Sequence, residues 1–153
     1  MSAAHLHLIT NHFPLIGLFF ATVLMSWGLL GRVPDFFRAG LVVSVIAGVF
    51  AVPTYLSGEP AEKELDHQPG FSQRVEEHEE AAEFGIWCIA LTALASAAGF
   101  VQLSRKRRLE QRWMVALTLL ALFSLTVIGR TSYLGGQISH PEIRDVADTP
   151  PAK

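Results

Sequence analysis

The chain has 153 residues, a formal net charge of −2 and hydrophobic residues at 50% of its positions, with a mean hydropathy of +0.35. This composition is too apolar for a typical water-soluble domain, and the apolar residues come in blocks. The lone cysteine, Cys88, excludes an intramolecular disulfide and a cysteine metal cluster. Because the basic residues are few and sit mostly in short connections, we expect no nucleic-acid partner.

Four apolar blocks follow one another along the chain, at 13–30, 36–56, 84–103 and 113–134. Each is close to the ~20 residues that a helix needs to cross a hydrocarbon layer ~30 Å thick. The stretches 41–56 and 114–129 contain no charged residue, so they lack the polar face of a soluble helix. The sequence therefore predicts an all-α integral membrane protein: an up-down bundle of four helices in one domain, 1–141, followed by a flexible tail, 142–153.

Charged residues are divided unevenly between the two sides of the predicted bundle. Seven basic residues fall in the first-to-second and third-to-fourth connections, namely Arg32, Arg38, Arg105, Lys106, Arg107, Arg108 and Arg112. Basic residues in short loops resist translocation, so these connections should face the cytoplasm. Both termini should then face the outer side of a bacterial cytoplasmic membrane. All six histidines lie on that outer side, together with most of the acidic residues.

The second and fourth predicted helices end in similar strings. Residues 54–59 read TYLSGE and residues 132–137 read SYLGGQ. Each predicted hairpin also opens with a histidine at its outer end, His12 in the first and His78 in the second. Two hairpins that start on the same face predict a duplication about a pseudo-twofold axis along the membrane normal. The alternative is that the tyrosine is simply an interfacial residue and the glycine a helix cap.

Three histidines, His5, His7 and His12, precede the first apolar block. The apolar residues between them predict that the first helix begins before Pro14. That proline should kink the helix and tilt His12 toward the bundle axis. His5 and His12 are seven residues apart and share a helical face, whereas His7 points elsewhere. The three imidazoles therefore cannot all bind one centre.

His78 stands near the outer end of the third predicted helix, with the small residues Ala82 and Gly85 four and seven positions later on the same face. Small residues leave room for a flat ring. A haem held between helices needs that clearance, and it needs imidazoles from two facing helices at its iron. The first and third helices are diagonal neighbours in an up-down bundle, so His12 and His78 are our first choice of axial ligands.

Three further residues join this predicted cofactor site. His140 and His7 are the second choice of iron ligands, which allows either one haem b or two. Apart from Arg38 at the start of the second block, Arg130 is the one basic residue inside a predicted span, where arginine usually has a partner. It should bind a haem propionate or a carboxylate at a quinone site. A salt bridge to Glu59 or Glu83, or snorkelling to the outer headgroups, is the alternative.

Other metal motifs fit the acidic stretch 76–83 poorly. An H-E-x-x-H motif would need histidine where Ala82 stands, and the Glu-x-x-His of di-iron bundles would need glutamate where Val75 stands. A looser zinc, copper or nickel site built from outer histidines and glutamates stays open.

Four short helices, the string His12-Phe13-Pro14, the outer His78 and the glycine pair at 135–136 resemble a family of uncharacterised small bacterial membrane proteins that are suspected b-type cytochromes. More broadly, the chain resembles the four-helix haem core of membrane cytochromes b. The resemblance implies haem b, ligated by paired histidines on facing helices, and electron transfer. Those cytochromes typically place two haems near opposite membrane faces, whereas this chain has no inner-side histidine.

We therefore expect an integral membrane b-type haem protein that carries electrons near the outer membrane face. It would work between a quinol pool and a periplasmic redox protein, or as one subunit of a redox complex, rather than as a stand-alone enzyme. Two alternatives remain. One is a histidine-rich membrane protein that binds zinc, copper or nickel directly; the other is a cofactor-free structural or assembly subunit held by helix packing.

Overall fold

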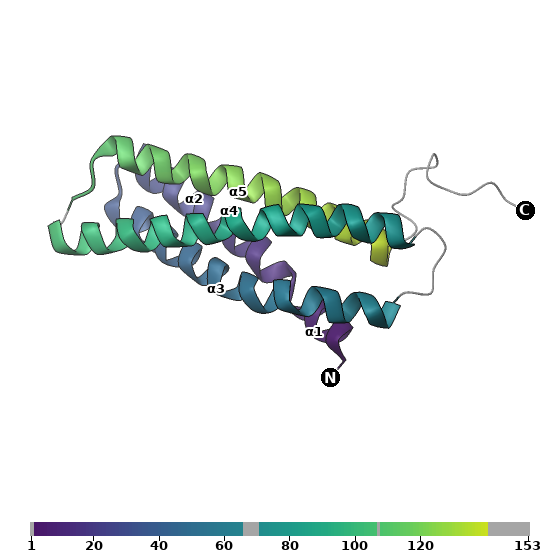
Figure 1. Ribbon diagram of the computed structural model, residues 1–153. Coiled ribbons are helices and arrows are strands. Elements are labelled where there is room, and N and C mark those ends of the chain that lie inside the picture. Colours follow the sequence, from purple (N-terminus) through teal and green to yellow (C-terminus); the bar gives the residue numbers. More distant parts are fainter. Residues whose placement is uncertain (1, 66–70, 107, 141–153) are drawn as a thin grey trace, which may run out of the picture.

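The computed structural model describes residues 2–65, 71–106 and 108–140. It contains five helices and, in these ranges, no strand: α1 Ala3–Thr10, α2 His12–Leu30, α3 Pro34–Leu65, α4 Phe71–Lys106 and α5 Gln111–Ser139. The short α1 leads directly into α2, so the chain forms four long antiparallel rods (Figure 1). The predicted all-α four-helix bundle is confirmed. The tail 142–153 and His67 lie outside the described residues.

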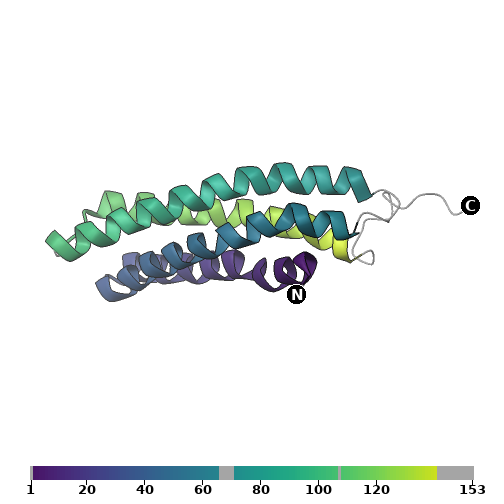
Figure 2. The ribbon, with the colours of Figure 1, turned by 60° about the horizontal axis from the view of Figure 1, so that its bottom comes forward.

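Each long helix packs against two others. α3 contacts α2 and α4, and α5 contacts α4 and α2, which leaves α2 and α4 at opposite corners of the bundle (Figures 1 and 2). The helix α1 packs on α3. The beginning of α1 and the end of α5 lie at the same end of the bundle, which we call the histidine end because it carries His7 and His78. The opposite end, where α2 joins α3 and α4 joins α5, we call the arginine end.

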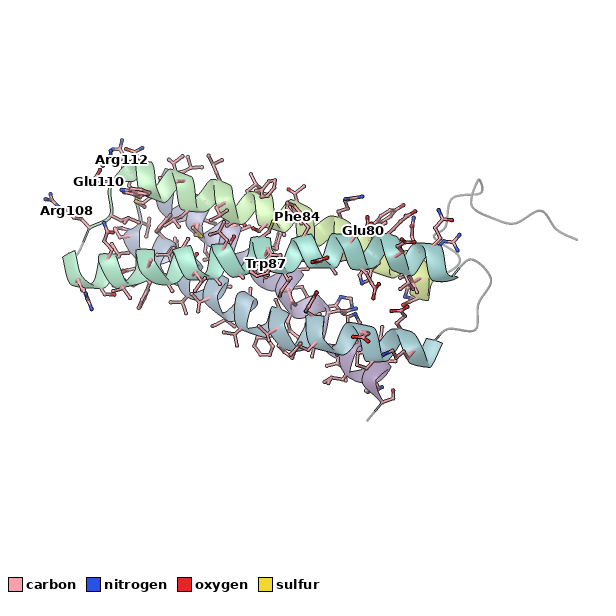
Figure 3. All side chains as sticks on the ribbon, in the orientation of Figure 1. Glu80, Phe84, Trp87, Arg108, Glu110 and Arg112 are labelled. Atoms are coloured by element: carbon pink, nitrogen blue, oxygen red, sulfur yellow. The ribbon has the colours of Figure 1, made fainter. Side chains whose placement is uncertain are left out.

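The four long helices are long and apolar enough to cross a membrane, over Ala4–Leu30, Pro34–Lys63, Gln73–Arg105 and Gln111–Ser139. Their outward faces carry large apolar side chains. On α4, for example, Trp87 is 72% exposed and Leu94 is 71% exposed, and Phe84 lies on the same helix (Figure 3). A surface of this kind is stable against lipid tails and not against water. The chain is therefore a multi-pass membrane protein in contact with the bilayer.

The second long helix is longer than the sequence predicted. We expected it to end near residue 56, with an irregular connection beyond, but α3 continues to Leu65 with Pro53 and Pro60 inside it. Each proline removes one backbone N–H from the helix. The Thr54 hydroxyl links this part of α3 to α1, because it is placed to donate to the Thr10 carbonyl of α1 as well as to the Phe50 carbonyl of its own helix. Packing against α1 thus keeps this part of α3 helical.

The break near the N-terminus lies one turn before Pro14, where we placed a kink. The chain is interrupted at Asn11, between α1 and α2. Pro14 is buried in the first turn of α2 and has no N–H to donate to the Thr10 carbonyl, four residues earlier. That carbonyl instead accepts a hydrogen bond from the Thr54 hydroxyl of α3.

Small residues allow the helices to approach closely. A Cβ at Gly40 of α3 would lie 2.9 Å from the Ala21 carbonyl oxygen of α2 and 2.5 Å from the Met25 Cγ. Neither helix could keep its position with a larger residue there. Close approach through glycine is how membrane helices gain packing energy, since lipid provides no hydrophobic drive between them.

Candidate functional site

His78 of α4 is half-buried and is held by the neighbouring helix α5. Its Nδ1 lies 3.0 Å from the carbonyl oxygen of Thr131. Because a carbonyl oxygen can only accept, Nδ1 carries the hydrogen and donates it, which leaves Nε2 of the neutral ring with a free lone pair. One turn after Thr131, a Cβ at Gly135 would lie 3.0 Å from His78 Cε1. Glycine at that position therefore gives the imidazole its room.

His7 of α1 is also half-buried and is held by α3 in the same manner. Its Nδ1 lies 3.0 Å from the Thr54 carbonyl oxygen and 3.2 Å from the Ser57 hydroxyl, which itself donates to that carbonyl. Nε2 is again the nitrogen left free. Gly58, one turn after Thr54, is the residue beside the ring: a Cβ there would lie 3.8 Å from His7 Cε1, an ordinary contact distance.

The threonines tie the two histidine sites into one repeated pattern. The Thr54 hydroxyl donates to the carbonyl of Thr10, three residues after His7, at 3.1 Å. The Thr131 hydroxyl donates to the carbonyl of Ala81, three residues after His78, at 3.0 Å. In both places the threonine carbonyl accepts from the histidine, and a glycine follows four residues later. We call each set a His–Thr–Gly unit: His7, Thr54 and Gly58 in the first, and His78, Thr131 and Gly135 in the second.

The repeated units agree with the predicted duplication but in another register. The sequence strings paired Tyr55 with Tyr133, whereas the contacts pair Thr54 with Thr131, which is one residue out of step. Both tyrosines are largely exposed on the outside of the bundle. The matching tyrosine strings therefore lie on the lipid-facing side. The repeat that contacts the histidines is the Thr-x-x-x-Gly spacing on the inner side.

Both units lie at the histidine end of the bundle. His7 on α1 and His78 on α4 are close enough to interact electrostatically. In the described part of the chain, no group of three or more histidine, cysteine, aspartate or glutamate side chains could hold a metal ion. The site therefore presents two imidazole nitrogens and no third protein ligand among the described residues.

The other predicted site residues lie elsewhere. His12 is exposed at the start of α2, and His140 is exposed at the end of α5, where its backbone N–H caps the Gly136 carbonyl. The Arg130 side chain is exposed on α5, next to Thr131. No ion pair in the described residues joins Arg130 to Glu59, which pairs with Lys63 at 2.7 Å. The structure thus brings His7, our second choice, within electrostatic range of His78. The cofactor roles of all these residues stay predictions.

Two oriented imidazoles can contribute to more than one kind of metal centre. Structural zinc needs four protein ligands and catalytic zinc needs three, so a bare ion would need further ligands beside these two. A haem iron needs only two ligands from the protein, because the porphyrin supplies the other four. The number of donors on these two residues therefore matches a haem. No protein-family profile, curated protein or solved structure matches the chain.

Proposed function

We propose that this chain is a membrane b-type haem protein that transfers electrons, and that the Nε2 atoms of His7 and His78 are the axial ligands of one haem b. The observation that carries the proposal is the pair of Nδ1 contacts, each 3.0 Å from a backbone carbonyl oxygen. Such contacts fix the tautomer and the ring orientation and make the opposite nitrogen a better ligand.

The bundle geometry supports the same assignment. Facing helices of a four-helix bundle are the usual source of paired haem ligands. His7 comes from α1, which leads into α2, and His78 comes from α4, which is diagonal to α2. When bound, the haem supplies a one-electron redox couple, which the protein tunes through ligands, hydrogen bonds and burial. A second haem on the exposed His12 and His140 is not part of the proposal.

Charge distribution supports an orientation for the site in a bacterial cytoplasmic membrane. Arg108 and Arg112 lie at the arginine end, far from Glu80 on the other half of α4 (Figure 3). The same end of the bundle carries three more basic residues near the helix ends: Arg32, Arg38 and Arg105. By the positive-inside rule this end faces the cytoplasm, so the haem site and both termini face outward.

The proposed electron partners follow from this placement. The outer part of α4 carries the exposed carboxylates Glu76, Glu77, Glu79, Glu80 and Glu83. They would steer a basic periplasmic redox protein toward the outer end of the bundle. A quinol in the surrounding bilayer is the other proposed partner, since the helices carrying both His–Thr–Gly units face lipid on their outer sides. In either case the chain would serve as an electron carrier or as a subunit of a redox complex.

An absorption spectrum of the purified protein tests the proposal. Protein produced with haem available should show a sharp b-type band after reduction with dithionite, and His78→Ala should lose it. His5→Ala removes an exposed histidine of α1 and should leave the band intact, which makes it the matched control. A colourless wild-type protein that retains stoichiometric zinc, copper or nickel would overturn the haem assignment in favour of direct metal binding. A colourless protein without metal would favour a structural subunit.

A further inference from the structure

A layer of buried hydroxyl groups crosses the middle of the bundle. All four long helices contribute to it, through Thr22, Ser44, Thr92, Ser96, Thr118 and Ser124. On α3 the order along the helix is Leu41, Ser44, Ala47, so the hydroxyl stands between two apolar positions. Leu41 belongs to an apolar cluster toward the arginine end, and Ala47 belongs to another toward the histidine end. We call the six residues the hydroxyl layer.

Four of these hydroxyls have hydrogen-bond partners. Thr22 and Thr118 donate to carbonyls one turn earlier in their own helices. Thr92 and Ser124 lie 2.8 Å apart, oxygen to oxygen, and share the carbonyl of Cys88 as acceptor. These contacts satisfy the buried hydroxyls in the way that membrane helices commonly do.

Ser44 and Ser96 are the exceptions. Both side chains have no exposed area, and neither hydroxyl oxygen has a hydrogen-bond partner within the described structure. An unpaired hydroxyl buried in an apolar core is costly, because the alternative environment in the unfolded chain satisfies it. Native proteins rarely leave such a group without a partner, and ordered water is the usual one.

The two serines occupy the same level of the α3–α4 interface. On the side toward the histidine end, Gly48 of α3 meets Ala93 of α4. On the side toward the arginine end, a Cβ at Gly99 of α4 would lie 3.7 Å from the methyl carbons of Leu41 of α3. Ser44 stands between Leu41 and Gly48, and Ser96 stands between Ala93 and Gly99. The antiparallel packing therefore places the two unpaired hydroxyls across from one another.

We propose that Ser44 and Ser96 together bind a buried water molecule in the middle of the bundle. Such a site needs two to four polar partners. The two hydroxyls supply two of them, and the backbone carbonyls of the preceding turns have a second lone pair for the water hydrogens. Apolar clusters lie on both sides of the hydroxyl layer, so the water would be isolated from both membrane faces. This site is independent of the haem proposal and would exist in the apoprotein.

A double-mutant cycle on the full chain tests the water site, with the thermal unfolding midpoint in detergent as one readout. Ser44→Ala and Ser96→Ala should each lower the midpoint by a few degrees, because each leaves the water with too few partners. The double variant should be no less stable than either single variant, because the water and both unpaired hydroxyls are then gone and no buried polar group is left without a partner. Ser124→Ala, which removes a hydroxyl with visible partners, is the control showing that the assay detects one lost bond.

A second readout detects the water itself. Nuclear Overhauser contacts should connect a long-lived water with the backbone amide protons of Ser44 and Ser96 in the wild type, and they should vanish in the double variant. Single variants with raised midpoints would show that the hydroxyls are simply unpaired and would overturn the proposal. The proposal would also be overturned if the single variants left the midpoint unchanged, or shifted it by amounts that simply add in the double variant, and no water contacts were seen. Each serine would then bond within its own helix.

Discussion

The Nδ1 atom of His78 lies 3.0 Å from the carbonyl oxygen of Thr131 on the neighbouring helix. This contact decides which nitrogen of the ring is available, because the carbonyl accepts the only ring hydrogen of the neutral imidazole. The orientation of the ring, and with it that of the free Nε2, is then fixed. The matching contact of His7 with Thr54 makes the arrangement a pair, and a pair of oriented imidazoles is what a haem iron requires.

Replacement of Gly135 by alanine should displace His78. The new Cβ would lie 3.0 Å from the His78 Cε1, so the ring or the helix must shift, at a cost of about 1–3 kcal/mol for overpacking. We expect a lower thermal midpoint and weaker haem binding, measured by thermal unfolding and by haem titration.

Two other glycines provide controls for that change. Gly129→Ala places a Cβ on the same helix with nothing within 4 Å, and Gly58→Ala places one at 3.8 Å from His7 Cε1. Both should keep haem affinity, and Gly129→Ala should gain up to about 1 kcal/mol of helix stability. Equal loss of haem in Gly135→Ala and Gly129→Ala would show that α5 is sensitive to any substitution. It would contradict a specific role of Gly135 in making room for His78.

Thr131→Val should weaken the link between α4 and α5. It keeps the shape of the side chain but removes the hydroxyl that donates to the Ala81 carbonyl at 3.0 Å, a loss of about 0.5–1.5 kcal/mol. Thr126→Val is the matched control, because the exposed Thr126 hydroxyl bonds only within α5. A midpoint that falls equally in both variants would contradict the proposed cross-helix role of Thr131.

Cysteine labelling in intact cells should report the orientation of the bundle. Cys88 is buried, and Cys88→Ser removes it as a background site. In that background His140→Cys should react with a membrane-impermeant maleimide, whereas Arg108→Cys should react only after the membrane is permeabilised. The reverse pattern would place the histidine end in the cytoplasm and remove the periplasmic partner from the proposal.

Periodicity and length were enough to predict the four helices, because crossing a bilayer imposes a length and an apolar composition that a sequence displays openly. The site was harder. His7 and His12 look alike in the sequence, and only the break at Asn11 and the packing of α1 on α3 turn His7 inward and leave His12 exposed. The one sequence signal for this choice was the repeated Thr-x-x-x-Gly spacing, which the more visible tyrosine strings concealed.

The extended part of α3 shows the same limitation in the fold. Pro53 and Pro60 are typical signals for the end of a helix, yet α3 continues through both. The cause is tertiary: the Thr54 hydroxyl and the contact with α1 stabilise this part of the helix. A local sequence pattern shows neither this hydrogen bond nor this packing. The sequence alone therefore predicted the end of the helix too early.

Titration of the purified apoprotein with haemin, in wild type and in the variants His7→Ala and His12→Ala, tests the central claim most directly. The wild type should bind one haemin per chain with a six-coordinate low-spin spectrum, His12→Ala should behave in the same way, and His7→Ala should lose the low-spin spectrum. Retention of that spectrum in His7→Ala, together with its loss in His12→Ala, would contradict the pairing of His7 with His78.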